Sequence, residues 1–235
     1  MENQESFETS RIILGKKSAP AENNILSADY VNQKYLYRFI KRLIDLVGSS
    51  IGLIFLLPLF LIIALAIKKE EKKEPVFFSQ KRIGKDGKEF KIYKFRSMCV
   101  DAEKKLTELL KYNEVDGAMF KIKKDPRVTK IGGFIRKTSI DELPQLWNVL
   151  KGDMSLVGPR PPLVREVEKY TEYDKQRLLI KPGCTGVWQI SGRNNVNFYD
   201  MVEMDIEYIN SLSIYTDIKI ILKTAYIMIK PNGAY

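Results

Sequence analysis

The sequence contains no histidine and only two cysteines, Cys99 and Cys184, in 235 residues. The lack of histidine excludes histidine bases, histidine metal ligands and Ser-His-Asp catalysis. Two cysteines so far apart indicate neither a disulfide framework nor a zinc site, and they fit a reducing, cytosolic setting. Chemistry must therefore come mainly from Asp, Glu, Lys, Tyr, Ser or Cys, and a metal held by carboxylates would be a hard ion such as Mg²⁺.

Acidic residues are the minority charge, with 29 Asp and Glu against 39 Lys and Arg, for a net charge of +10. Residues 1–33 hold five acidic and three basic residues, a net charge of −2, so the rest of the chain carries +12. A basic body predicts an anionic partner, which could be nucleic acid, anionic lipid or a phosphorylated substrate. Residues 1–33 are polar and lack the apolar core of a signal peptide, so they predict a flexible leader.

Residues 46–67 form a run of 22 residues without charge, long enough to cross a bilayer as a helix. Pro58 lies inside this run, where it removes a backbone hydrogen bond and bends a helix. Both flanks are basic, and the positive-inside rule assigns both to the cytoplasm. A helix that enters the membrane, turns at Pro58 and leaves on the same face satisfies that rule, and an ordinary span with a tolerated proline is the alternative. The flanking cations are Lys34, Arg38, Lys41, Arg42, Lys68, Lys69, Lys72 and Lys73.

The first half after this run has one pattern typical of strands. Residues 76–82 and 90–95 flank the Asp-Gly turn within residues 85–88, which predicts a β-hairpin. Apolar residues at helical spacing predict a helix over 102–110. Residues 113–133 contain Asp-Pro and Gly-Gly pairs and are predicted to be rich in loops.

Helices are predicted for most of the second half. Apolar residues recur at helical spacing between residues 143 and 150, and because Pro144 fits only the first turn, this helix is expected to begin near Asp141. Residues 163–180 are charged and predicted to be helical. Residues 218–229 form an apolar stripe with lysines elsewhere, which suits a helix on an anionic membrane or one packed on the domain's own core.

Asp141 and Glu142 form an acidic pair with Arg136 before it and Arg160 after it. A capping box from Ser139 to Glu142 would explain acidic residues at a helix N-terminus without any catalytic role. In the functional interpretation, arginines and free N–H groups bind phosphate while a carboxylate attacks phosphorus to form an acyl phosphate. The approach of two anions would need neutralising by arginine and Mg²⁺. Spacing alone leaves both interpretations open.

Eight short motifs occur in order: 41–45 (KRLID), 93–98 (YKFRSM), 125–129 (DPRVT), 140–145 (IDELPQ), 148–155 (NVLKGDMS), 157–161 (VGPRP), 181–183 (KPG) and 192–194 (GRN). With them the chain, from about residue 34 to 235, resembles the bacterial polyprenyl-phosphate phosphoglycosyl transferases of the monotopic type, also called bacterial sugar transferases. Any one motif would be weak, but eight in order are specific. The resemblance implies transfer of a sugar 1-phosphate from a UDP-sugar to polyprenyl (undecaprenyl) phosphate, with release of UMP. That step begins capsule, exopolysaccharide or O-antigen synthesis.

The resemblance also implies roles for single residues. By position, Asp141 would be the nucleophile that takes the phospho-sugar, and Asp141 and Glu142 would hold Mg²⁺. Residues 186–193 look more similar to members that transfer a hexose 1-phosphate, of glucose or galactose, than to those using diacetamido sugars. Contacts to phosphate or to the rest of the substrate would come from Lys94, Arg136, Arg160 and Arg193.

The resemblance favours the re-entrant helix, although the family often breaks this helix at Ser-Pro and here Leu57 precedes Pro58. We predict a monotopic α+β protein, mainly helical, with a small β-hairpin and interfacial amphipathic helices. Its parts are a leader (1–33), a proline-broken re-entrant membrane helix (34–73) and a catalytic domain (74–235) on the cytoplasmic face of the bacterial inner membrane. The expected partners are UDP-sugar, polyprenyl phosphate and membrane lipid, and a homo-oligomer is left open. Nucleic acid is not expected, because basic charge alone is weak evidence for it. The alternative function is a membrane-tethered basic scaffold for anionic lipids or assembly partners.

Overall fold

The computed structural model describes residues 26–109, 111, 122, 125–191 and 196–229. Helices dominate these residues, which confirms a mainly helical fold with small sheets and one long apolar helix compatible with membrane insertion. The α-helices are α2 (Ala28–Asn32), α3 (Tyr35–Glu70), α4 (Ala102–Leu109), α5 (Lys130–Lys137), α6 (Gln145–Lys151), α7 (Val164–Val167), α8 (Glu172–Lys175), α9 (Val187–Ser191), α10 (Phe198–Asn210) and α11 (Ile214–Ile229). The 3₁₀ helices are η1 (Lys85–Gly87), η3 (Ile140–Glu142) and η4 (Gln176–Leu179).

The predicted hairpin is confirmed as strands β1 (Phe77–Ile83) and β2 (Glu89–Phe95), which pair antiparallel. Its turn contains Asp86 at φ 56° and Gly87 at φ 74°. Both lie in the left-handed region, which glycine adopts freely and aspartate tolerates better than most residues. The Asp-Gly pair therefore sets this turn.

A second sheet was not predicted. Strands β3 (Ser155–Val157) and β4 (Gly183–Thr185) pair in parallel across a long stretch of chain. The two backbones approach so closely here that a Cβ on Gly183 would lie 2.1 Å from the backbone nitrogen of Gly158. Glycine at position 183 is therefore required for this pairing.

The N-terminal part of α3 is anchored to the domain by charged side chains. Lys41 forms an ion pair of 2.8 Å with the buried carboxylate of Asp217 in α11. Arg42 donates two hydrogen bonds to carbonyls in the last turn of α6, and Asp45 accepts one from the hydroxyl of Ser155 in β3. Two of the predicted basic flank residues, Lys41 and Arg42, therefore hold the domain together as well as carrying charge.

The C-terminal part of α3 contacts the same domain through a different set of residues. Ile63 and Ile67 are buried against Phe95 of β2 and Ile135 of α5. The carboxylate of Glu70 accepts hydrogen bonds from the first two N–H groups of α5, at 2.8 and 2.9 Å. Both ends of α3 therefore pack on one folded unit.

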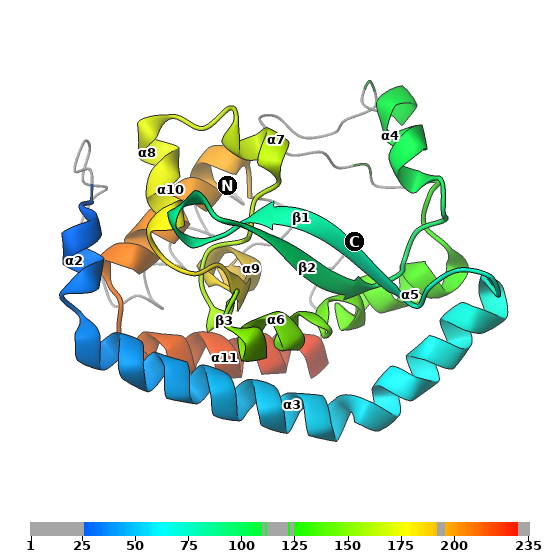
Figure 1. The fold of residues 1–235 in the computed structure, drawn as a ribbon, viewed down its shortest axis with the longest axis horizontal. Coiled ribbons are helices and arrows are strands. Elements are labelled where there is room, and N and C mark those ends of the chain that lie inside the picture. The colour runs from blue at the N-terminus through cyan, green and yellow to red at the C-terminus, as the bar shows by residue number, and fades with distance from the viewer. Residues whose placement is uncertain (1–25, 110, 112–121, 123–124, 192–195, 230–235) are drawn as a thin grey trace.

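The middle of α3 is exposed and apolar. Phe55 is 79% exposed, and Leu57, Leu61 and Leu65 are exposed as well. Only 11% of the most apolar window of α3 is buried, which distinguishes it from the core helix of a soluble protein. The helix continues through Pro58 and is bent along its length (Figure 1). This exposed surface suits contact with lipid.

The C-terminal helix α11 lies beside α3 along the base of the domain (Figure 1). Ile220 of α11 is fully buried, whereas Ile218 and Leu222 are exposed on its other side. One face of the predicted amphipathic helix therefore packs on the core, as one of its two alternatives expected, and the other face leaves apolar surface next to α3.

Three local expectations need correction. The predicted loop at Gly132–Gly133 is the start of α5, capped by Thr129, and Gly132 is required because a Cβ would lie 2.0 Å from the carbonyl oxygen of Ser97. Residues 163–180 form the short helices α7 and α8 and the 3₁₀ helix η4, which follows α8 directly. The last part of the predicted leader forms α2, whose Tyr30 hydroxyl bonds to a carbonyl of α10. Residues 1–25, and most of 112–124, lie outside the described residues.

Candidate active site

The turn that carries Asp141 and Glu142 differs from the predicted capping box. Ser139 adopts a left-handed conformation, φ 58°, and its side chain makes no capping hydrogen bond. Residues 140–142 form the short helix η3, and α6 begins only at Gln145. A left-handed non-glycine residue is unfavourable by about 1–2 kcal/mol. The capping explanation was therefore wrong. The helix predicted to begin near Asp141 begins there as a 3₁₀ turn, and its α-helical part starts only at Gln145.

The two neighbouring carboxylates have different electrostatic environments. Asp141 is buried, with 8% of its surface exposed, whereas Glu142 forms an ion pair of 2.5 Å with Lys94. Burial raises the pKa of Asp141 to about 6 against the opposing charge of Lys94, and the charge of Glu142 adds to the rise. Burial also opposes ionisation of Glu142, but Lys94 outweighs it and holds the pKa of Glu142 below its usual value. Such divergence between neighbouring carboxylates is typical of groups with separate roles in catalysis.

Arg136 and Trp188 bring hydrogen-bond donors to the same place. The Arg136 Nη1 and the Trp188 Nε1 are buried and have no hydrogen-bond partner within the described part of the chain. A buried donor without a partner is unfavourable by about 1–3 kcal/mol. Both residues line one cavity with Asp141, so a ligand there would lie beside their side chains.

That cavity has a volume of about 610 Å³ and two kinds of lining residue. The charged ones are Lys94, Arg136, Asp141 and Glu142. The apolar or small ones include Gly52 of α3, Leu146 of α6, and Ile221, Ala225 and Met228 of α11. Helices α6 and α11 both contact α3, so this apolar lining comes from the helices that pack with the exposed apolar helix.

A smaller cavity of about 120 Å³ adjoins the first and shares Lys94 and Glu142 with it. Arg82 and Arg160 supply its other cations. The Arg82 Nη1 donates to a backbone carbonyl at 3.0 Å, and burial together with the charge of Arg160 lowers the pKa of Arg82 to about 10. This cavity therefore offers arginine and lysine side chains to an anionic group.

Arg160 is held by residues behind it. Its guanidinium bonds to the buried Glu166 at 2.9 and 3.4 Å. Its carbonyl accepts a hydrogen bond from Arg177, whose own guanidinium pairs with the fully buried Asp205. These contacts fix the position of Arg160 at the cavity wall.

Most of the predicted site residues meet in these cavities. Lys94, Arg136, Asp141 and Glu142 line the larger cavity, and Arg160 lines the smaller one. Arg193 lies outside the described residues. Sequence reasoning missed Arg82, because its neighbours in the hairpin include several lysines and only the fold shows which cation is buried.

Residues 36–231 match the sequence profile of the family described as "Bacterial sugar transferase". This chain belongs to the bacterial sugar transferase family. The galactosyl transferase CpsE of Streptococcus agalactiae is 53% identical over 204 residues, which cover 86% of this chain and 44% of CpsE. The undecaprenyl-phosphate galactose phosphotransferase of Salmonella typhimurium is 46% identical over 202 residues, 84% of this chain and 42% of that protein.

The exopolysaccharide production protein ExoY of Rhizobium meliloti is 40% identical over 199 residues, which cover 83% of this chain and 88% of ExoY. This chain thus spans less than half the length of CpsE and of the Salmonella protein, and most of the length of ExoY.

The carboxylate pair of this family member can be compared with the ligands that a magnesium ion requires. Within the described residues, no three Asp, Glu, His or Cys side chains gather as a metal cluster. Magnesium, however, is commonly bound by one or two carboxylates together with water and substrate phosphates. Asp141 and Glu142 fit that pattern, because Lys94 bonds to only one oxygen of Glu142.

Cys184 lines both cavities and is the other candidate nucleophile. Burial raises the pKa of its thiol far above the usual value. A protonated thiol is a poor nucleophile. The environment therefore favours Asp141 over Cys184 for attack on phosphorus.

Proposed function

We propose that this protein transfers a hexose 1-phosphate from a UDP-hexose to undecaprenyl phosphate through a phospho-sugar on Asp141. The observation that carries the proposal is the position of the carboxylate pair where an apolar cavity against α3 and α11 meets a basic one. Relatives in the family are named as transferases of galactose or glucose 1-phosphate to undecaprenyl phosphate, which supports the substrate class. The step would begin the synthesis of an exopolysaccharide, as the name of ExoY suggests.

The basic side of the site suits the diphosphate of the donor. Arg82 and Arg160 line the smaller cavity, and Lys94 lies between the two cavities. Arginine forks bind phosphate oxygens with two parallel hydrogen bonds, and each such charged bond is stronger than a neutral one. A diphosphate held there would place its sugar-bearing phosphorus next to Asp141.

The apolar side suits the polyprenyl acceptor. Its walls come from α3, α6 and α11, and both α3 and α11 expose further apolar side chains. An isoprenoid chain could lie along this surface with its phosphate at the charged residues, where Arg136 has a buried donor without a partner. The arrangement brings a lipid phosphate and a soluble nucleotide sugar to the same carboxylate.

The reaction then proceeds in two displacements at one phosphorus atom. An oxygen of ionised Asp141 bonds to the sugar-bearing phosphorus, the diphosphate P–O bond breaks and UMP leaves. An oxygen of the lipid phosphate next attacks the same phosphorus, the aspartyl P–O bond breaks, and Asp141 is restored as polyprenyl-diphospho-sugar forms. Arg136, Lys94 and Arg160 stabilise the negative charge on the phosphoryl oxygens. Bound Mg²⁺ would neutralise further phosphate charge at Asp141 and Glu142.

We further propose that α3 enters the membrane and returns on the same, cytoplasmic face. The support is that Lys41 and Asp45 before the apolar run, and Ile67 and Glu70 at its end, all contact the same folded domain. A straight span would carry its far end about 30 Å away, on the other side of the bilayer. Tags at residues 1 and 235 should be equally accessible from the cytoplasmic side, and opposite accessibility would exclude re-entry.

A panel of UDP-sugars tests the proposed function. With Mg²⁺ and undecaprenyl phosphate present, we expect UMP release from UDP-galactose or UDP-glucose and much less from UDP-diacetamido sugars. The expectation for hexoses rests on the stretch 186–193 and on the names of the relatives. Lack of UMP release from every donor, with lipid binding retained, would instead favour the scaffold alternative.

The raised pKa of Asp141 predicts a pH dependence of the reaction. Only the ionised carboxylate can attack phosphorus, and burial raises its pKa to about 6. We therefore expect kcat/KM for the UDP-hexose to be level above pH 7 and to fall about tenfold per unit below pH 6. A profile that stays flat to pH 4.5 would contradict an Asp141 with this environment.

A further inference from the structure

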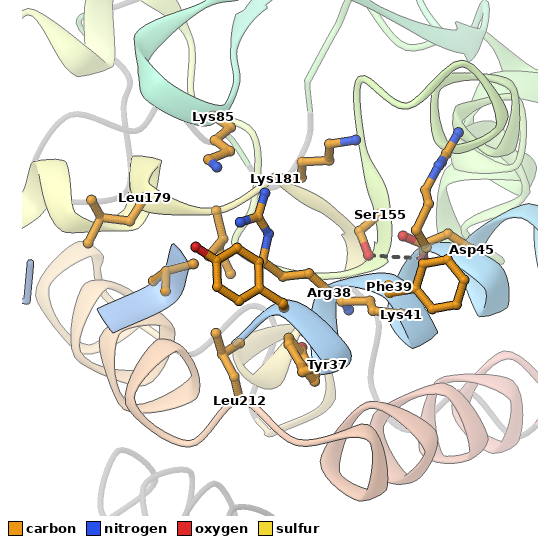
Figure 2. A pocket seen from close by; sticks show the side chains of 14 residues that line it. Tyr37, Arg38, Phe39, Lys41, Asp45, Lys85, Ser155, Leu179, Lys181 and Leu212 are labelled. Atoms are coloured by element: carbon orange, nitrogen blue, oxygen red, sulfur yellow. Dashed lines mark hydrogen bonds between the residues drawn. The ribbon is translucent and has the colours of Figure 1, made fainter. Parts of the chain in front are cut away.

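A third cavity lies apart from the active site. Its volume is about 470 Å³, and none of its lining residues lines either of the other two cavities. It is formed by the start of α3, the η1 turn of the hairpin, and the chain on either side of Ile180 (Figure 2). Strands β3 and β4 separate it from the active site, because Ser155 and Lys181 border this cavity while Leu156 and Cys184 border the larger one.

The cavity is lined by an excess of positive charge. Arg38, Lys85 and Lys181 all line it; in Figure 2 the ends of Arg38 and Lys85 lie near each other, while the ammonium of Lys181 points away from them. Asp45 is the acidic residue among those that line it, and its carboxylate accepts hydrogen bonds from Ser155 and the backbone of Leu156. The cavity therefore has cations that its own carboxylate does not neutralise.

The three cations make few contacts of their own. Within the described residues, Lys181 forms no hydrogen bond or ion pair, and Lys85 lies 3.9 Å from the exposed carboxylate of Asp86. Arg38 makes one hydrogen bond, of 3.3 Å, to Asn32. Burial, together with the charges of Arg42 and Lys85, lowers the pKa of Lys181. An anion placed among these groups would relieve that repulsion.

The position of the cavity indicates where this anion comes from. Tyr35 and Phe39 line it and are 72% and 63% exposed, so one wall is an apolar, aromatic surface open to the surroundings. Phe39 precedes the uncharged run by seven residues, which is roughly 10 Å along a helix. Aromatic and basic side chains at this distance from an apolar segment are typical of the headgroup level of a bilayer.

We propose that this cavity binds the headgroup phosphate of an anionic glycerophospholipid, with Arg38, Lys85 and Lys181 around the phosphate and the acyl chains along Tyr35 and Phe39. The inference rests on the proposed placement of α3 in a membrane and is independent of the transfer reaction. Such a lipid would fasten the start of α3 to the membrane surface. It would also hold Lys181 two residues from Gly183, which lines the active site.

Lipid retention by the full-length chain in a zwitterionic detergent tests the proposal. Native mass spectrometry should show one phosphatidylglycerol retained, and phosphatidylcholine much less. Each lysine near a membrane surface contributes about 1 kcal/mol to the binding of anionic lipid, so Lys85→Gln with Lys181→Gln should weaken phosphatidylglycerol binding about 30-fold. The double change of Lys85 and Lys181 to arginine should restore it.

A matched control separates position from total charge. Lys88 and Lys169 are exposed and lie outside the cavity, so changing both to glutamine removes the same charge and should leave phosphatidylglycerol binding unchanged. Equal loss in the control, equal retention of phosphatidylcholine, or wild-type binding in the Lys85 and Lys181 glutamine variant would overturn the proposal. Displacement of the lipid by equimolar inorganic phosphate or by undecaprenyl phosphate would also overturn it, because the site would then serve a soluble anion or the acceptor.

The lipid site and the transfer reaction can fail separately. The glutamine variant should release UMP at the wild-type rate in detergent without phosphatidylglycerol, because neither lysine lines the active site. Normal UMP release with unselective lipid binding would remove the lipid site and leave the proposed function standing. Selective lipid retention without UMP release from any UDP-sugar would remove the proposed function and leave the lipid site standing.

Discussion

Replacing Asp141 with asparagine is expected to reduce UMP release from the UDP-hexose by a factor on the order of 10⁴ or more. Removing a covalent nucleophile has effects of this size in enzymes where the remaining groups still bind substrate. Asparagine matches the shape of aspartate but cannot form the acyl phosphate. Steady-state UMP release with undecaprenyl phosphate present measures the effect.

The folded state should tolerate this substitution. Burial raises the pKa of Asp141, which means that the surroundings disfavour its charged form, so a neutral asparagine should not lower the melting temperature. The matched control is Asp101→Asn, at an exposed aspartate far from the cavities, which should keep wild-type activity. Activity of the Asp141 variant within tenfold of wild type would remove Asp141 from the nucleophile role.

Replacing Arg136 with methionine is expected to lower kcat/KM by about 10²–10³-fold, the range seen when one preorganised donor to a developing charge is removed. Arg136 has a buried Nη1 without a partner in the described part of the protein and lines the cavity beside Asp141. Lysine at this position should recover only part of the activity, because it keeps the charge and loses the planar fork. Initial rates at varied UDP-hexose concentration give kcat/KM for the wild type, the methionine variant and the lysine variant.

Stability provides a second measurement on the same variant. Because the buried Nη1 has no protein partner, methionine should leave the melting temperature unchanged or raise it, as happens when a functional group is held at the expense of stability. Lys137→Met is the control, since Lys137 is an exposed cation next to Arg136 on the same helix. If Arg136→Met loses stability and keeps kcat/KM within threefold of wild type, Arg136 is structural.

The sequence predicted the local elements with the strongest patterns. The hairpin followed from two strand-like stretches around an Asp-Gly turn, and the long apolar helix followed from 22 uncharged residues. The parallel pairing of β3 with β4 could not be predicted, because each strand has three residues and their pairing depends on close approach at Gly183. Gly132 misled for a related reason, since it is needed for packing against Ser97 in a helix and not for a loop.

The residues of the candidate site were also predicted only in part, because the sequence does not show the tertiary contacts. Lys94, Asp141 and Glu142 were chosen from motifs and Arg136 from its place before the acidic pair, and the fold brings all four to one cavity. The left-handed Ser139 could not be foreseen, because Ser-x-x-Glu is also a favourable capping sequence. The sequence placed Lys41 and Arg42 in the basic flank and in a family motif but did not show that both bind the folded domain. Tertiary contacts decide which of several similar charges is buried.

The most direct test of the account is the intact mass of the protein after incubation with UDP-hexose and Mg²⁺ in the absence of acceptor lipid. We expect a covalent adduct of one phospho-hexose, located on Asp141 by peptide mapping, missing from Asp141→Asn and lost when undecaprenyl phosphate is added. A wild-type protein that transfers the sugar phosphate but forms no adduct, or forms it on another residue, would contradict the proposed role of Asp141.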